Sequence, residues 1–245
     1  MTERAPVRIA MWSGPRTLST ATMRAWENRP DTVVVDEPLY AYYLAATGID
    51  HPGRDEILAS QPTDWHTVVH SLTTDDLPDG ATISYQKHMT HHVLPEIDLG
   101  TLEPLTHAHL IRDPRRVLAS YTKVRDQPTL ADLGVQQQVA LHRRFGGPVV
   151  DSDDLLRDPE GVLRALCAAL GVPFDAAMLS WPAGRRNSDG VWARFWYASV
   201  EASTGFGPYR GTDVPDLPDH LAALAEQCRP YYDELAAARL TALRS

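Results

Sequence analysis

The stretch SGPRTLSTATM, residues 13–23, follows the apolar run VRIAMW of residues 7–12. A short apolar run that leads into glycine, proline and hydroxyl residues is typical of a β-strand that turns into a helix. The first backbone N–H groups of a helix lack intrahelical partners and carry the positive end of the helix dipole, so such a turn often holds a phosphate-like anion. The stretch therefore predicts an anion site after the first strand of an α/β fold.

The side chains of this turn suit an anion as well. Gly14 permits a tight turn, and Arg16 adds a fixed positive charge that can contact two oxygens of one anion. Thr17, Ser19 and Thr20 supply hydroxyl groups near the helix start. The GxxxxGK[ST] pattern of ATP- and GTP-binding loops is absent, which disfavours an ATPase or GTPase of the usual kind. A plain strand–helix turn capped by serine and threonine stays open as the alternative.

Further β-rich runs alternate with helical patterns along the chain. Short apolar runs of this kind suit strands that are covered on both faces. Strands that alternate with helices predict a three-layer, doubly wound α/β fold with a central parallel sheet of about five strands. With the first run at residues 7–12, the expected strands are 32–36, 82–86, 108–112 and 148–151.

The length of 245 residues suits one domain, and we expect residues 1–245 to form it. Residues 181–215 are rich in tryptophan, glycine and arginine without a strong period, which indicates a long binding loop. We expect acceptor-site loops there and around residues 38–80. In the amphipathic C-terminal segment, Pro230 predicts a break or kink near Arg229.

The composition bears on partners and on location. The formal net charge of −9 argues against nucleic acid or an anionic membrane as a partner. The polar N-terminus indicates no signal peptide, and no apolar run approaches the roughly 20 residues of a membrane span. Cys167 and Cys228 have no metal-ligand or disulfide-framework spacing, so we expect free thiols and a cytoplasmic protein. The histidines of residues 88–92 lack a further strong ligand nearby, and we expect no metal.

A second basic stretch, LIRDPRRVLASY, spans residues 110–121. Arg112 ends the fourth expected strand, Asp113 and Pro114 fit the first positions of a helix, and Ser120 lies eight residues after Arg112. Alone, this stretch could be a solvated basic helix start. Because ligands bind beyond the carboxyl ends of parallel strands, the two stretches together predict two anion sites on one sheet edge. They suit a ligand that carries phosphates at both ends.

These stretches resemble the sulfotransferases that use 3′-phosphoadenosine 5′-phosphosulfate (PAPS). PRTLST is similar to the phosphosulfate-binding loop of that family, and Arg112, Asp113, Pro114 and Ser120 match its 3′-phosphate motif. The segment 151–174 looks like the family stretch that ends in Leu-Gly-Val, although Ser152 stands where a nucleotide-contacting tyrosine is common. The resemblance covers most of residues 7–175.

The resemblance implies which residues hold the donor. Arg112 and Ser120 would hold the 3′-phosphate, and Tyr209, Arg210 and Gly211 stand near the place of a late loop that touches the same phosphate. Leu18 departs from the family, whose loop often has glycine there. The loop residues that would hold the 5′-phosphosulfate are Gly14, Pro15, Arg16, Thr17, Leu18, Ser19 and Thr20.

Two residues are candidates for the base that takes the acceptor's proton. Glu37 follows the second expected strand and resembles a glutamate used by a bacterial branch of the family. His88 ends the third expected strand, near the place of the histidine base of the common branch. A neutral histidine suits proton transfer near pH 7, whereas glutamate needs burial to raise its pKa. Asp36 is a weaker candidate than Glu37, because adjacent strand residues face opposite ways.

The sequence thus predicts a PAPS-dependent sulfotransferase that moves a sulfuryl group to a hydroxyl, or less readily an amine, of a small-molecule metabolite. Arg16, helped by Lys87, would stabilise the transferring group, and 3′,5′-adenosine bisphosphate (PAP) would be the product. The alternative is a small-molecule kinase or a nucleotide-binding protein with an atypical phosphate loop. The aromatic residues proposed for the acceptor pocket are Tyr40, Tyr42, Tyr43, Trp192, Phe195, Trp196 and Phe206.

Overall fold

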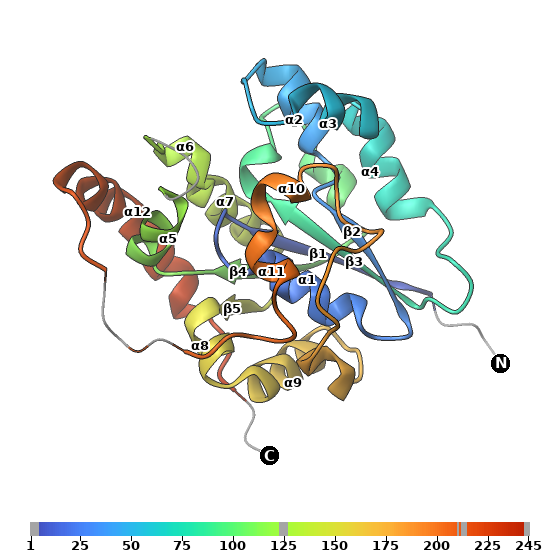
Figure 1. Ribbon diagram of the computed structural model, residues 1–245. Helices are drawn as coiled ribbons and strands as arrows, with labels where there is room; N and C mark the ends of the chain where they lie inside the picture. The colour runs from blue at the N-terminus through green and yellow to red at the C-terminus, as the bar shows by residue number, and fades with distance from the viewer. Residues whose placement is uncertain (1–4, 123–126, 210, 212–214, 243–245) are drawn as a thin grey trace.

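The computed structural model describes residues 5–122, 127–209, 211 and 215–242. Within them, a five-stranded parallel sheet with the strand order β2-β3-β1-β4-β5 forms the centre of the molecule (Figure 1). Each strand overlaps one of the expected β-rich runs. The strands are β1 (Val7–Ser13), β2 (Thr32–Asp36), β3 (Ile83–Met89), β4 (Thr106–Ile111) and β5 (Val149–Asp151).

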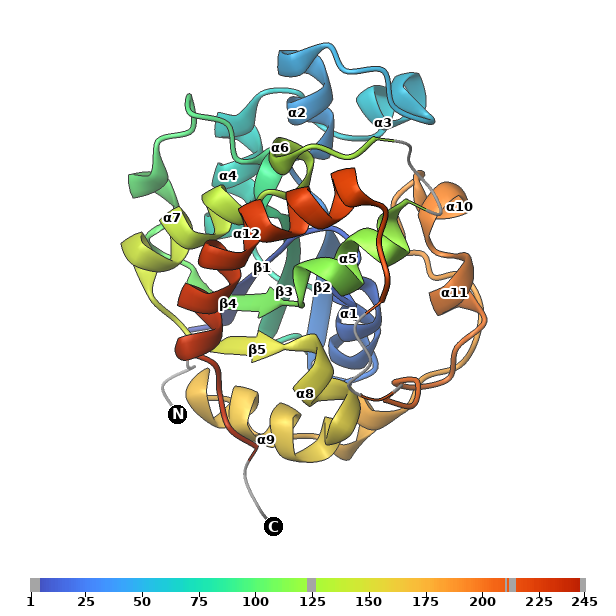
Figure 2. The ribbon, with the colours of Figure 1, turned by 90° about the vertical axis from the view of Figure 1, so that its left-hand side faces the viewer.

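Helices cover both faces of this sheet, as the two views in Figures 1 and 2 show. Helices α1, α8 and α9 pack on one face, and α4, α7 and α12 pack on the other. The expected three-layer α/β fold is therefore confirmed. The longer helices are α1 (Ser19–Glu27), α2 (Tyr40–Thr47), α4 (Trp65–Thr74), α5 (Pro114–Tyr121), α7 (Val135–Phe145), α9 (Pro159–Ala169) and α12 (Asp219–Ala237). The shorter ones are α3 (Arg54–Ser60), η1 (Thr90–His92), η2 (Leu99–Leu102), α6 (Leu130–Leu133), α8 (Ser152–Arg157), η3 (Ala176–Leu179), α10 (Ala193–Trp196) and α11 (Ala198–Glu201).

Successive side chains of the central strands alternate between the two cores. In β1, Ile9 and Met11 join the core under α1 and α9, whereas Ala10 and Trp12 join the core under α4 and α7. The parallel pairing extends this alternation into β3, where Tyr85 belongs to the first core and His88 lies against Trp12 in the second. Whether a residue of β3 stands at an odd or an even position therefore decides toward which face of the sheet its side chain points.

Helix α12 departs from the expectation at Pro230. The helix runs without interruption from Asp219 to Ala237, with Pro230 inside it. A proline removes one backbone hydrogen bond and costs roughly 3 kcal/mol in a helix interior. The apolar face of α12 is buried on both sides of the proline, at Leu224 and Leu235, and packs against α5, α7 and the sheet. We infer that this packing offsets the cost, so the predicted break was wrong.

Buried histidines make the stability of this fold depend on pH. Burial lowers the pKa of His88 and of His109 to about 3 and that of His107 to about 4. Burial also lowers the pKa of His92 well below its usual value. The unfolded chain binds protons below about pH 6.5 while these native histidines stay neutral, so stability falls as the pH falls. We expect each to cost about 1.4 kcal/mol per pH unit below that value. Urea unfolding at about pH 7 and about pH 5.5 measures the effect, and equal midpoints would contradict it.

Candidate active site

The loop between β1 and α1 has an unusual backbone. Arg16 and Leu18 have φ angles of 61° and 67°, in the left-handed region that non-glycine residues rarely adopt. Glycine would take the Leu18 conformation without steric cost, which accounts for the glycine at this place in the family that the loop resembles. Gly14 is required for another reason, since a Cβ there would lie 2.7 Å from the Leu133 carbonyl oxygen.

Three side chains hold this loop by its carbonyl groups. Arg112 Nη1 donates to the Arg16 carbonyl at 2.9 Å, and Ser152 Oγ donates to the Thr17 carbonyl at 2.7 Å. Thr17 Oγ1 donates to the Gly14 carbonyl at 2.9 Å. Thr17 and Ser152 therefore support the loop from behind. The N-terminus of α1, with its unpaired first-turn N–H groups, is left to serve a ligand.

A cavity of about 730 Å³ opens in front of this loop. Its wall comes from the loop and the start of α1, from α5, from the ends of β2 and β3, and from residues 196–209. Gly14 and Thr17 line a smaller pocket behind the loop instead. The expected site residues that line the large cavity are Pro15, Arg16, Leu18, Ser19, Thr20, Glu37, Lys87, Arg112, Ser120 and Tyr209.

The two basic sequence motifs meet at one end of the cavity. Arg16 Nε donates to Ser120 Oγ at 3.0 Å, which joins the first loop to α5. Burial lowers the pKa of Arg16 and of Arg112, and in the described part of the chain neither guanidinium forms an ion pair with a carboxylate. Within the part of the chain that the structure describes, the Nε atom of Arg112 is buried without a hydrogen-bond partner. This end of the cavity thus holds partly desolvated positive charge, which an anionic ligand would neutralise.

Tyr209 and Gly211, near the end of the segment 181–215, lie at the same end of the cavity. Arg157 Nη2 donates to the Tyr209 hydroxyl at 2.6 Å, and Arg116 Nη2 donates to the Gly211 carbonyl at 2.5 Å. Tyr209 and Arg116 line the cavity. Gly211 does not line it, but its carbonyl accepts the hydrogen bond from Arg116. The remaining residue predicted here, Arg210, lies outside the described residues.

An acidic cluster occupies the other end of the cavity, around Lys87 of β3. Lys87 Nζ is buried and donates to Asp36 Oδ1 at 2.9 Å, to Glu37 Oε1 at 2.5 Å and to the Tyr197 hydroxyl at 2.7 Å. The expectation that Asp36 and Glu37 face apart was wrong. Glu37 has a φ angle of 40°, so the chain turns where β2 ends and both carboxylates reach the same lysine.

Burial and mutual charge set the protonation of this cluster. Burial raises the pKa of Glu37, the Asp36 charge adds to this effect, and Lys87 opposes it. Burial alone would favour a neutral Lys87 amine, but Asp36 and Glu37 raise the pKa of Lys87 well above its usual range. Lys87 is therefore a fixed cation, whereas Glu37 lies on the cavity wall with a raised affinity for a proton.

The structure places His88 away from the cavity. Its ring lies on the opposite face of β3 from Lys87, 4.4 Å from the Trp12 ring between centroids. His88 Nε2 lies 3.2 Å from Gln86 Oε1, in the core under α4 and α7. Burial lowers its pKa to about 3. Because neighbouring strand residues point to opposite faces, only one of Lys87 and His88 could face the cavity, and His88 does not reach it.

The aromatic residues proposed for the acceptor pocket do not all reach the cavity. Tyr40 and Trp196 line it. Tyr42, Tyr43 and Trp192 are buried, Phe206 packs against the core, and Phe195 is 37% exposed. Tyr197 also lines the cavity and was not predicted from the sequence, although it lies within the aromatic-rich stretch VWARFWYASV. Other lining residues that were not predicted include His51, His92, Arg116 and Tyr121.

The chain matches the family model described as the sulfotransferase domain over residues 7–239. It belongs to the sulfotransferase family. The resemblance carried by residues 13–23 and 110–121 is thereby confirmed, and the sulfotransferase domain extends beyond the region that the motifs covered.

Two curated relatives of this sulfotransferase domain come from Arabidopsis thaliana. "Branched-chain-amino-acid aminotransferase-like protein 1" is 42% identical over 206 residues, which cover 82% of this chain and 37% of that protein. "Branched-chain-amino-acid aminotransferase-like protein 2" is 36% identical over 233 residues, which cover 93% of this chain and 41% of that protein. The chain thus spans about two fifths of the length of these relatives.

Solved structures of sulfotransferases share the fold. The sulfotransferase domain of the Synechococcus PCC 7002 olefin synthase aligns with a TM-score of 0.53 at 18% identity, covering 93% of this chain and 96% of that chain. The sulfotransferase domain of the curacin biosynthetic pathway gives 0.56 at 15%, covering 93% and 99%. A sulfotransferase from Alicyclobacillus acidocaldarius gives 0.53 at 13%, covering 97% and 98%. At these identities the likeness concerns the fold.

The described residues form neither a candidate metal site nor a helix that could span a membrane. Residues 5–122, 127–209, 211 and 215–242 contain no group of three or more histidine, cysteine, aspartate or glutamate side chains placed to hold a metal ion. The helices formed by these residues are also too short or too polar for any of them to span a bilayer.

Proposed function

We propose that this sulfotransferase domain moves a sulfuryl group from PAPS to a hydroxyl group of a small molecule. The observation that carries the proposal is the cavity itself. It has Arg16, Arg112 and the start of α1 at one end and the Glu37 carboxylate at the other. A doubly phosphorylated donor suits the cationic end, and an acceptor that must lose a proton suits the carboxylate.

The residues present fit the donor. Arg112 and Ser120 would hold the 3′-phosphate, and the left-handed loop around Leu18 would present the N–H groups of α1 to the phosphosulfate. The buried Arg112 Nε, which has no hydrogen-bond partner among the described residues, is an available donor at that end. Bound there, PAPS supplies an activated sulfuryl group.

The protein's own groups would serve the transfer in defined ways. The acceptor oxygen attacks the sulfur, and the bond from the sulfur to the 5′-phosphate oxygen breaks. The electron pair of that bond leaves with PAP, and the acceptor's proton passes to Glu37. Arg16 and the N–H groups of α1 would stabilise the charge that develops on the transferring group and on the leaving phosphate. Lys87, which contacts two carboxylates and Tyr197, holds the base in place.

The acceptor would lie against Tyr40, His51 and Trp196 on the Glu37 side of the cavity. Aromatic side chains with polar tips suit a small organic molecule. A hydroxyl acceptor fits better than an amine, since most amines are protonated near pH 7 and would carry one more proton to remove. Both cysteines are free and buried, and we propose a cytoplasmic location on that basis.

The names of the curated relatives raise an aminotransferase as another function. That chemistry uses a lysine that forms an imine with a cofactor, and such a lysine must lose its proton. Lys87 is buried between two carboxylates that raise its pKa, which disfavours this role. The relatives are more than twice as long as the matched region, so their names can describe the remainder of those proteins.

Calorimetric titration tests the proposal against the nucleotide-binding alternative. We expect PAP to bind tightly and to compete with PAPS, and we expect ATP with Mg²⁺ to bind weakly. A preference for ATP with Mg²⁺ would contradict the proposal and favour a kinase. Transfer from radiolabelled PAPS to a panel of phenols, alcohols and sugars then identifies the acceptor.

A further inference from the structure

Besides its contact with Lys87, Asp36 forms hydrogen bonds with Gly190 and Tyr197 of a distant segment. Its Oδ1 accepts from Lys87 Nζ at 2.9 Å, and its Oδ2 accepts from the Gly190 backbone N–H at 3.1 Å. The Tyr197 hydroxyl lies 2.8 Å from both oxygens. Asp36 is 5% exposed and does not line the cavity, whereas Glu37 does. The two adjacent carboxylates thus share one lysine, and only one of them faces the acceptor.

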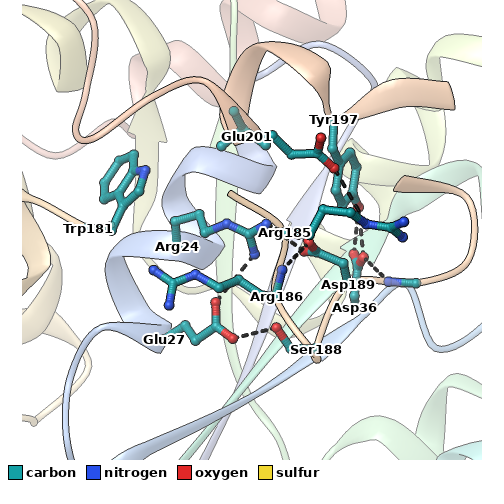
Figure 3. A network of polar contacts seen from close by, with 12 residues as sticks. Arg24, Glu27, Asp36, Trp181, Arg185, Arg186, Ser188, Asp189, Tyr197 and Glu201 are labelled. Carbon is teal, nitrogen blue, oxygen red and sulfur yellow. Dashed lines mark hydrogen bonds and ion pairs between the residues drawn. The ribbon is translucent and has the colours of Figure 1, made fainter. Parts of the chain in front are cut away.

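The segment 189–197 holds Asp36 in this position, as Figure 3 shows. Tyr197 donates to Asp36 and accepts from Lys87 and from Trp192 Nε1, the last at 3.1 Å, so its hydroxyl is fully used. One residue before Gly190, Asp189 pairs with Arg24 of α1 at 2.7 Å, and both side chains are fully buried. The segment that carries Trp196 into the acceptor end of the cavity is therefore tied to α1 and to Asp36.

We propose that Asp36 is a positioning residue that engages Lys87 and so keeps Glu37 from being neutralised by that lysine. The segment 189–197 sets this arrangement through the Gly190 N–H and the Tyr197 hydroxyl. A glutamate that faced the lysine alone would be a strong ion-pair partner and a weak base. With Asp36 present, the buried cluster carries two carboxylates for one ammonium, and Glu37 keeps its affinity for the acceptor's proton.

The groups around the pair come from several elements. Asp36 is the charge that repels the Glu37 carboxylate, and Lys87 is the charge that attracts it. Arg24 of α1 acts on Asp36, and His92 lies near Lys87 but is held neutral by burial. Among the described residues, the titratable and charged groups that face the cluster are Arg24, Asp36, Glu37, Tyr40, Tyr85, Lys87, His92 and Tyr197.

The test measures the pKa of Glu37 directly, without donor or acceptor. Carbon-13 NMR follows the side-chain carboxyl carbons through a pH titration, and the Glu37 resonance is the one that Glu37→Gln removes. We expect the pKa of Glu37 to fall by about one pH unit in Asp36→Asn, because Lys87 then has Glu37 as its sole carboxylate partner. We expect it to fall in Tyr197→Phe as well, because Asp36 then loses the hydroxyl that holds its two oxygens beside Lys87.

A matched control removes another negative charge from the same network. Glu27 pairs with Arg24 at 3.3 Å and contacts Ser188, away from the cavity. Glu27→Gln should leave the pKa of Glu37 unchanged. An unchanged pKa in Asp36→Asn would overturn the proposal, and if that variant does not fold, an unchanged or raised pKa in Tyr197→Phe would overturn it.

The same variants have a second readout, which rests on the proposed function. In single-turnover transfer, the acid limb of the pH–rate profile should move to lower pH in Asp36→Asn, and the limiting rate should fall less than in Glu37→Gln. A loss of rate without movement of the acid limb would mark Asp36 as purely structural. Failure of the proposed function would remove transfer in the wild type but leave the NMR titration intact, so the two failures are distinguishable.

Discussion

Replacing Glu37 with glutamine should lower the single-turnover rate of sulfuryl transfer by about 100- to 10,000-fold, the range that a general base contributes. Glutamine keeps the shape of the side chain and can still accept from Lys87 Nζ, but it cannot take the acceptor's proton. PAP binding should stay within about twofold, because Glu37 lies at the other end of the cavity from Arg112. Rapid-quench measurement with radiolabelled PAPS, together with calorimetry for PAP, separates the two effects.

His88→Gln is the matched comparison for this prediction. His88 lies on the other face of β3, and its ring is tilted against the Trp12 ring instead of lying on the cavity wall. We expect the rate of transfer to stay within about threefold of the wild type and the free energy of unfolding to decrease. If His88→Gln stops transfer in a folded protein while Glu37→Gln does not, the assignment of the base is wrong.

Replacing Arg112 with alanine should weaken PAP binding by about 10- to 100-fold, the value of one or two hydrogen bonds to a charged group. The same change removes the bond to the Arg16 carbonyl that supports the first loop, so the loss should lie toward the upper end of this range. Isothermal titration with PAP measures the dissociation constant.

Arg115→Ala controls for the loss of one positive charge from the same helix. Arg115 donates to the Pro215 carbonyl at 3.2 Å and does not line the cavity. Its removal should change the dissociation constant of PAP by less than about threefold at moderate salt, since salt screens charges that do not contact the ligand directly. Equal losses in Arg112→Ala and Arg115→Ala would indicate a general electrostatic effect and would contradict a specific phosphate contact.

The cationic end of the cavity, with Arg16, Arg112 and Ser120, could be predicted closely from the sequence. Its residues lie in two local motifs, and each motif follows a strand whose apolar pattern is clear. Because carboxyl ends of parallel strands meet at one edge, the motif with Arg16 and the motif with Ser120 had to come together, and they share a hydrogen bond. The sequence could not distinguish the loop residues that lie behind the turn, Gly14 and Thr17, from the loop residues that line the cavity.

The acceptor side could not be predicted to the same depth. Whether Glu37 or His88 serves the cavity depends on the parity of β3 and on the turn at Glu37, and neither follows from composition or spacing. Tyr197 lies 110 residues from Lys87, yet its hydroxyl completes the cluster. Such long-range contacts leave no periodic signal in the chain.

The sequence by itself determined the alternation of strands and helices, the turn with Arg16 between the first strand and helix, and the likeness to sulfotransferases. These features follow from local patterns, which are backbone propensity, residue spacing and charge within a few residues. Only the tertiary structure decided that Asp36 and Glu37 share Lys87 and that His88 faces the opposite core. The physical reason is that burial and the pairing of distant charges set proton affinities, and both exist only after the chain has folded.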